Sequence, residues 1–232
     1  LSSRRILGGK LYLLANTGKM KKFLKFSLSK TKRINDDRTA TEERWSKIYQ
    51  SNKNSKFYSV IKKNLNFIAK SKLVLEYGCS IGIITSYLAD SHDMVFGIDR
   101  SFSALWYAKK SFKNNLDYIV ADSLSPVFGK LQFDLVLALN VLELIEPVNL
   151  LKQVSKQIST GYFIISDPYD FDRGTNSVRK PVDESTLRTN LLNLGFKISS
   201  DTKNPSHIPW NLKLNSRATL NYKVDLIIGK KN

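Results

Sequence analysis

Three short apolar segments of the chain end in acidic residues that could hold a polar ligand. The first runs into Glu76-Tyr77-Gly78-Cys79-Ser80-Ile81-Gly82, a glycine-containing turn followed by a helical pattern. The second ends at Asp99, 21 residues after Gly78, and the third ends in Ala121-Asp122-Ser123. The two oxygens of one carboxylate can accept both hydroxyl groups of a ribose. Asp122 is placed to accept from an exocyclic amino group.

The turn at 76–82 argues against a dinucleotide cofactor. A dinucleotide fingerprint requires Gly-x-Gly-x-x-Gly, and Ser80 and Ile83 occupy the second and third glycine positions. A carboxylate at Glu76 would repel a pyrophosphate and suits a cationic ligand. These features disfavour NAD and FAD.

Alternating sequence patterns predict the elements that position these residues. Short apolar runs are typical of buried strands, and they occur at 73–76, 94–98, 118–120, 133–139 and 162–165. Apolar residues at helical spacing follow the first two runs, at 81–88 and 104–112. Strands that alternate with helices indicate parallel βαβ units and an open α/β sheet. Ligands bind such sheets at the carboxyl ends of the strands, near the reversal of strand order.

Helices and a final hairpin are expected on either side of this alternation. Helical spacing within 40–70, which includes Trp45 and Tyr49, predicts two helices before the first strand. A helix at 182–194, a strand at 196–200, a long loop and a last strand at 222–229 follow. Because no helix separates the last two strands, we expect them to pair as an antiparallel hairpin.

This order of turn, acids and strands resembles the class I S-adenosylmethionine-dependent methyltransferases over about residues 73–144. The family pattern Glu-x-Gly-x-Gly-x-Gly is similar to residues 76–82, where Ser80 replaces the middle glycine. The resemblance implies a Rossmann-like seven-stranded sheet, mostly parallel with a C-terminal antiparallel hairpin, and helices on both faces. It implies an enzyme whose cofactor is S-adenosyl-L-methionine.

The resemblance also implies which residues bind the cofactor. Glu76, Gly78, Cys79 and Gly82 would hold the methionine moiety, Asp99 the ribose, and Asp122 with Ser123 the adenine. The full set of expected cofactor-binding residues is Glu76, Gly78, Cys79, Gly82, Asp99, Arg100, Asp122, Ser123 and Asn140. No catalytic residue is assigned, because methyl transfer needs the acceptor held in line and a base only where the acceptor loses a proton.

The acceptor side is less well defined by the sequence. Segments 167–170 and 208–213, with Arg217, are distantly similar to the methyltransferase domain of ovothiol-synthesising enzymes. That similarity implies acceptor contacts from Tyr169, His207 and Trp210. The alternative is structural: prolines that shape loops, and a tryptophan that packs against a helix. The Asn/Asp-Pro-Pro-Tyr motif of amide and base-amine methyltransferases is absent after the fourth strand, which weakens an exocyclic-amine acceptor.

Charge is concentrated in the N-terminal third. The chain has 232 residues and a net charge of +17, of which residues 1–72 carry +15. Residues 1–35 contain ten Lys and Arg and no acid, so they could attract nucleic acid or an anionic membrane surface. We therefore expect a basic arm, disordered or ligand-binding, at 1–39 and a methyltransferase domain with N-terminal cap helices (about 40–70) at 40–232. Met20 is a candidate start, which would shorten the arm.

The small number of cysteines and histidines excludes two classes of protein, those held by disulfides and those with a structural zinc site. A single cysteine, Cys79, excludes an internal disulfide framework, and Cys79 with two histidines is too few for a structural zinc site. A reducing, cytoplasmic location and no metal are expected, and no apolar run is long enough to span a membrane. Cys79 is interpreted as a small turn residue.

Three functional hypotheses follow. The first is a methyltransferase that acts on a small molecule. The second is an RNA methyltransferase that uses the basic arm as an electrostatic clamp. The third is a binding protein that kept the fold without turnover and attaches to nucleic acid or a membrane surface through the arm.

Overall fold

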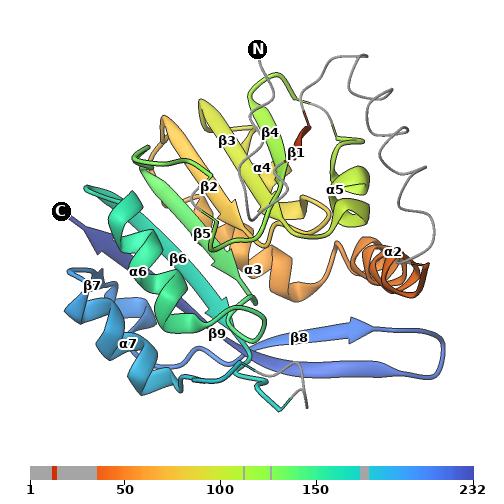
Figure 1. Cartoon of the computed structure of the whole chain (residues 1–232). Helices are drawn as coiled ribbons and strands as arrows, with labels where there is room; N and C mark the ends of the chain where they lie inside the picture. Colours follow the sequence, from red (N-terminus) through yellow and green to blue (C-terminus); the bar gives the residue numbers. More distant parts are fainter. Residues whose placement is uncertain (1–11, 15–35, 112, 126, 173–177) are drawn as a thin grey trace.

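The protein is built around one mixed β-sheet. The computed structural model describes residues 12–14, 36–111, 113–125, 127–172 and 178–232. In this part of the chain the strands lie in the order β1-β4-β3-β2-β5-β6-β9-β7, and β8 pairs only with β9 (Figure 1). Strands β4, β3, β2, β5 and β6 are parallel to one another, whereas β1, β7, β8 and β9 form antiparallel pairs.

The parallel strands have five to seven residues each, whereas β9 has thirteen and β7 only two. Their bounds are β1 Tyr12–Leu14, β2 Leu73–Tyr77, β3 Met94–Asp99, β4 Leu116–Val120, β5 Leu135–Leu139, β6 Gly161–Asp167, β7 Lys197–Ile198, β8 Ile208–Lys213 and β9 Thr219–Lys231. The chain order reverses between β2 and β5, which are direct neighbours. A ligand site is therefore expected where β2 and β5 end.

Helices cover both faces of the sheet. They are α2 Asp36–Ser51, α3 Lys56–Leu65, α4 Ile83–Leu88, α5 Phe102–Ala108, α6 Pro147–Gln157 and α7 Glu184–Asn193, with a 3₁₀ turn, η2, at Ser200–Thr202. One apolar core contains side chains of α2, α3, α4, α5 and β8, and the other contains side chains of α6 and α7. Figure 1 shows α6 and α7 together on one face of the sheet. The central strands are buried on both faces, which explains their continuous apolar runs.

Strand β9 belongs to two pairings along its length. Its first half pairs with β8 from Lys213↔Thr219 to Ile208↔Val224, and its second half pairs with β6 from Asp167↔Asp225 onward. The β8–β9 hairpin extends beyond the sheet beside α2 and α3 (Figure 1). The ring of Trp210 on β8 stacks on Tyr49 of α2, with centroids 6.4 Å apart, and lies 5.2 Å from the ring of Phe57 on α3.

The predicted Rossmann-like sheet with antiparallel C-terminal strands is confirmed, with differences near the C-terminus. The predicted strand at 196–200 is only β7, Lys197–Ile198, and it pairs with β9 as expected. The predicted loop before the last strand was wrong in part, because β8 occupies Ile208–Lys213. Alternation in β8 places Ile208, Trp210 and Leu212 in the core, although Pro209 disfavours a strand. Pro209 is tolerated because β8 is an edge strand with a single partner.

The N-terminal third carries two helices, which begin four residues before the expected boundary at 40. Helix α2 starts at Asp36, and α3 packs Phe57, Ile61 and Leu65 into the core. Most of the basic segment 1–35 lies outside the described residues; its described part is β1, which pairs antiparallel with β4. The expected division at 1–39 and 40–232 stays a prediction. No helix in the described part of the chain is long and apolar enough to cross a membrane.

Candidate functional site

The turn after β2 is held in a left-handed backbone conformation at three positions. Gly78, Ser80 and Gly82 have φ angles of 65°, 49° and 74°. A Cβ atom on Gly78 would lie 2.2 Å from Cγ1 of Val141, and one on Gly82 would lie 2.2 Å from the hydroxyl of Tyr118. Both glycines are therefore required by the packing of the turn as well as by its dihedral angles.

Ser80 shows how the turn tolerates the loss of the middle glycine. A non-glycine residue with positive φ costs roughly 1–2 kcal/mol. Here the backbone N–H of Ser80 donates to Oδ2 of Asp99 over 2.8 Å, which fixes the strained residue to the end of β3. This hydrogen bond holds Ser80 in place at the position where the family pattern has glycine.

Glu76 is the last but one residue of β2, just before this turn, and its carboxylate is buried. It is 4% exposed, and Oε2 accepts a hydrogen bond from the hydroxyl of Thr85 on α4. Burial raises the pKa of Glu76 to about 8; the Thr85 hydrogen bonds oppose this rise and the nearby Asp99 adds to it. Burial makes the ionised carboxylate unfavourable, and a cationic ligand beside it would favour the ionised form.

Asp99 at the end of β3 is fully engaged by two backbone donors. Its Oδ2 accepts from Ser80 N, and its Oδ1 accepts from Ser101 N over 2.8 Å. Burial raises the pKa of Asp99, while these two donors and Arg100 lower it. Arg100 is exposed. The carboxylate is held rigidly at the strand end, and each oxygen keeps a lone pair for a ligand hydroxyl.

Helix α2 brings a third acid to this end of the sheet. The hydroxyl of Ser101, the N-cap of α5, donates to Oε2 of Glu42 over 2.8 Å. Ser101 links the two acids, because its N–H donates to Asp99 and its hydroxyl to Glu42, and Glu42 contributes to the raised pKa of Asp99. Sequence reasoning missed Glu42, because an acid in the first turns of a helix is read as a dipole or surface residue.

The first two helices carry two tyrosines, Tyr49 on α2 and Tyr58 on α3. Burial raises the pKa of Tyr58 on α3, and the charges of Tyr49 and Glu76 raise it further. The ring of Tyr49 on α2 lies 5.8 Å from that of Trp45. The expected role of these helices as a cap over the cofactor stays a prediction.

The predicted adenine-binding residues, Asp122 and Ser123, follow the end of β4. Ala121 N donates to Asp99 O over 3.1 Å, which places Asp122 and Ser123 beside the β3 end. Asp122 is exposed, and its Oδ1 accepts from Leu124 N over 2.8 Å. The carbonyl of buried Ser123 accepts from Gln153 on α6.

Asn140 follows β5 and is held by β6. Its φ is 54°, a conformation that asparagine tolerates, and its N–H donates to Ser166 O over 2.7 Å. The hydroxyl of Ser166 donates to Oδ1 of Asn140 over 2.9 Å. Because Val141 packs against Gly78, Asn140 lies next to the turn that contains Glu76.

Cys79 is buried in the turn after β2. Its N–H donates to Ile98 O over 3.0 Å, and its sulfur lies near Gly97. Burial raises the pKa of the thiol well above its ordinary value, and Asp99 and Glu76 add to this effect. A thiol that stays protonated is a poor nucleophile. The described residues contain no group of three or more His, Cys, Asp or Glu side chains that could hold a metal ion.

The three acceptor-side candidates have different surroundings. Tyr169 follows β6 with a φ of 56°, and its hydroxyl donates to Asp225 on β9 over 2.8 Å. Trp210 is 5% exposed within an aromatic group that includes Tyr49, and His207 is exposed. Their roles in acceptor binding stay predictions.

Comparison with known proteins agrees with this geometry. Residues 74–161 match a family model described as a methyltransferase domain. The chain contains a methyltransferase domain. The matched segment runs from β2 to the start of β6 and includes the turn at 76–82, Asp99 and Asn140. The predicted class I methyltransferase is thereby confirmed. No curated protein matches the chain.

Solved structures share the fold of this methyltransferase domain at low identity. Magnesium protoporphyrin IX methyltransferase from Synechocystis, with S-adenosylmethionine bound, has 16% identity and a TM-score of 0.59, covering 94% of this chain and 100% of that chain. An S-adenosylmethionine-dependent methyltransferase from Mesorhizobium loti has 16% identity and a TM-score of 0.59, covering 77% and 99%. A Haloferax volcanii protein crystallised with the Trm112 methyltransferase activator has 15% identity and a TM-score of 0.62, covering 80% and 93%. These likenesses support the common fold.

Proposed function

We propose that this methyltransferase domain uses S-adenosyl-L-methionine to methylate a small-molecule acceptor. The observation that carries the proposal is the pair of acids at adjacent strand ends, the buried Glu76 and the half-buried Asp99. Glu76 and Asp99 flank the left-handed turn at 78–82, at the point where the strand order reverses. A cationic ligand that also carries a ribose matches both acids.

The residues of the site fit this cofactor by their chemistry. Glu76 is a desolvated carboxylate that a cationic group would stabilise in its ionised form. The lone pairs left on Asp99 suit a ribose diol, and Asp122 lies beside it for an amino group. When bound, S-adenosylmethionine supplies an activated methyl group on a sulfonium. The chain's own residues then have to orient the acceptor in line and exclude water.

Charge distribution supports a small acceptor over RNA. The excess of basic residues is in residues 1–72, and residues 73–232 carry a net charge of only +2. The predicted acceptor side, around Tyr169, includes Asp170, whose half-buried carboxylate would repel a phosphate backbone. The cytoplasmic location stays a prediction.

The first experiment is calorimetric titration of S-adenosylmethionine into the purified chain and into Asp99→Ala. We expect micromolar binding to the wild type and loss of binding in the variant. NAD serves as the control ligand and should not bind. A well-folded protein that binds no S-adenosylmethionine would contradict the proposal and favour the binding-protein alternative.

The acceptor class is tested with labelled methyl groups. S-adenosyl-L-[methyl-³H]methionine is incubated with the protein and with either the low-molecular-mass fraction of a cell extract or total RNA. Label in the small-molecule fraction is the expected result. Label in RNA, at a rate that falls steeply with salt, would show that the acceptor is RNA and not a small molecule. The proposed cofactor would be unaffected by that result.

A further inference from the structure

Two buried carboxylates face each other across the strands next to the proposed acceptor side. Asp167 ends β6 and is paired in register with Asp225 of β9. They are 1% and 3% exposed. Directly paired residues on adjacent strands point to the same face, and like charges there are destabilising. Such an arrangement persists only if each carboxylate is separately satisfied by donors.

Asp167 fixes two loops that follow neighbouring strands. Its Oδ2 accepts from Leu142 N over 3.0 Å, and its Oδ1 accepts from Tyr169 N over 2.7 Å. Leu142 belongs to the loop after β5, which also contains Asn140, and Tyr169 belongs to the loop after β6. One buried carboxylate therefore joins the cofactor side of the site to Tyr169. It also holds Tyr169 at its left-handed φ of 56°.

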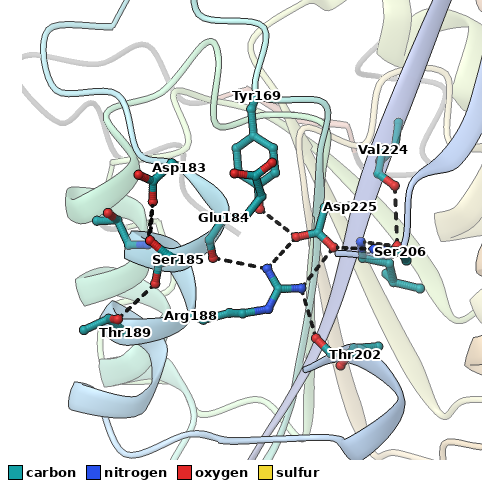
Figure 2. A network of polar contacts seen from close by, with 12 residues as sticks. Tyr169, Asp183, Glu184, Ser185, Arg188, Thr189, Thr202, Ser206, Val224 and Asp225 are labelled. Carbon is teal, nitrogen blue, oxygen red and sulfur yellow. Dashed lines mark hydrogen bonds and ion pairs between the residues drawn. The ribbon is translucent and has the colours of Figure 1, made fainter. Parts of the chain in front are cut away.

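Asp225 is satisfied by donors from three other segments, as Figure 2 shows. Arg188 of α7 donates from Nη1 to Oδ2 over 2.6 Å and from Nη2 to Oδ1 over 3.0 Å, a bidentate pair. The hydroxyl of Tyr169 donates to Oδ2, and Ser206 N donates to Oδ1 over 3.1 Å. Arg188 is held in turn by the carbonyls of Glu184 and Thr202. We call Asp225, Arg188, Tyr169 and Ser206 the Asp225 network.

The Asp225 network sits where β9 changes partner from β8 to β6. Ser206 directly precedes the β8–β9 hairpin, and its hydroxyl also bonds β9 through Leu226 N over 2.9 Å. Higher in the hairpin, the hydroxyl of Tyr222 donates to Asp170 over 3.2 Å. The base of the hairpin and the loop after β6 are thus connected at two points.

The hydroxyl of Tyr169 is fully committed to this network. Burial and the neighbouring Asp225 raise the pKa of Tyr169, so the phenol remains a hydrogen-bond donor and does not act as a base. The group that Tyr169 can offer to an acceptor is its ring. The orientation of that ring is set by Asp225 at the hydroxyl and by Asp167 at the backbone.

We infer that Asp225 is a positioning residue for acceptor binding, which holds the Tyr169 ring and the base of the β8–β9 hairpin against the acceptor side of the site. This inference rests on the proposed function. Asp225 acts through Tyr169 and touches neither Glu76 nor Asp99 in the hydrogen-bond pattern of the described residues. Its loss should weaken acceptor recognition and leave cofactor affinity intact.

The decisive variant is Tyr169→Phe, because it removes one hydroxyl and leaves the Arg188–Asp225 pair in place. Transfer of label from S-adenosyl-L-[methyl-³H]methionine is measured against increasing amounts of the low-molecular-mass extract. We expect the half-saturating amount to rise about tenfold, the equivalent of one strong hydrogen bond. Calorimetric affinity for S-adenosylmethionine should change by less than about twofold. Asp225→Asn should shift half-saturation at least as far.

The matched control is Asn115→Ala. Asn115 bonds the carbonyls of Ala89 and His92 at the opposite end of the strands, so its loss destabilises the fold away from the site. The control should leave half-saturation unchanged; an equal shift in it would assign the effect to stability and overturn the inference. A Tyr169→Phe variant with wild-type half-saturation would overturn it as well. A wild type that binds no S-adenosylmethionine overturns the proposed function and this inference together.

If Asp225→Asn fails to fold, Tyr169→Phe alone decides the question.

Discussion

Replacing the buried carboxyl group of Glu76 with an amide should stabilise the protein at neutral and alkaline pH. The pKa of Glu76 is raised from 4.5 to about 8 by burial, and the group is 4% exposed. Between these two pKa values the unfolded chain has lost the proton and the folded chain keeps it. Stability therefore falls as pH rises through this window, by about 1.4 kcal/mol per pH unit.

The size of the effect follows from those two pKa values. Well below pH 4.5 both states are protonated and the group contributes nothing to the pH dependence; above about pH 8 both are ionised and the loss levels off. Over pH 5 to 8 the carboxyl should remove roughly 3–4 kcal/mol from the free energy of unfolding. Glu76→Gln abolishes this titration and keeps an oxygen that can accept the Thr85 hydroxyl.

Urea denaturation of the wild type and of Glu76→Gln at pH 5, 6, 7 and 8 measures the difference directly. The advantage of the variant should grow with pH, and other titrating groups such as His92 cancel in the comparison. The same substitution should abolish S-adenosylmethionine binding, because a neutral amide cannot pair with a cation. If the difference in unfolding free energy between the variant and the wild type is constant over this pH range, the raised pKa of the buried Glu76 carboxyl is refuted.

Two further substitutions test the packing of the site. Gly82→Ala adds a Cβ against the Tyr118 hydroxyl at a φ of 74°, whereas Gly129→Ala meets nothing within 4 Å at a φ of 57°. We expect roughly 1–2 kcal/mol lost at Gly129 and a further 1–3 kcal/mol at Gly82, measured by urea unfolding, and equal losses would contradict the steric argument. Trp210→Ala should cost about 3–5 kcal/mol by removing a buried ring. Trp210→Phe should cost less than about 1.5 kcal/mol, since the indole Nε1 has no hydrogen-bond partner among the described residues.

The correct predictions of strands and of the turn depended mostly on residues close together in the sequence. The turn 76–82 and Asp99 could be predicted because each directly follows a buried apolar run, and parallel strands end at one edge of the sheet. Pairing confirms the positions, with Glu76 opposite Gly97 and Leu137 on the two neighbouring strands. Strand β8 could not be predicted with the same ease. Its apolar alternation is interrupted by Pro209. Its partner strand is β9, which follows it after the turn of the hairpin.

Contacts between distant segments were invisible in the sequence. Glu42 reaches Ser101 across 59 positions, and Tyr169 reaches Asp225 across 56. The role of an acidic residue in a strand or helix cannot be assigned from the sequence until its hydrogen-bond donors are known. The aromatic group around Trp210 likewise depends on the hairpin folding back onto α2 and α3.

The sequence by itself determined the alternation of strands and helices from β2 to β6, the turn and the acids at the strand ends, because these depend on local hydrophobic periodicity and backbone chemistry. Only the tertiary structure decided why Gly78 and Gly82 must be glycine, since Val141 and the Tyr118 hydroxyl occupy the space of their side chains. It alone decided that Asp167 and Asp225 face each other in the interior. A buried carboxylate is stable only when hydrogen-bond donors surround it. Those donors come from segments far apart in the sequence, so they cannot be identified before the tertiary structure is known.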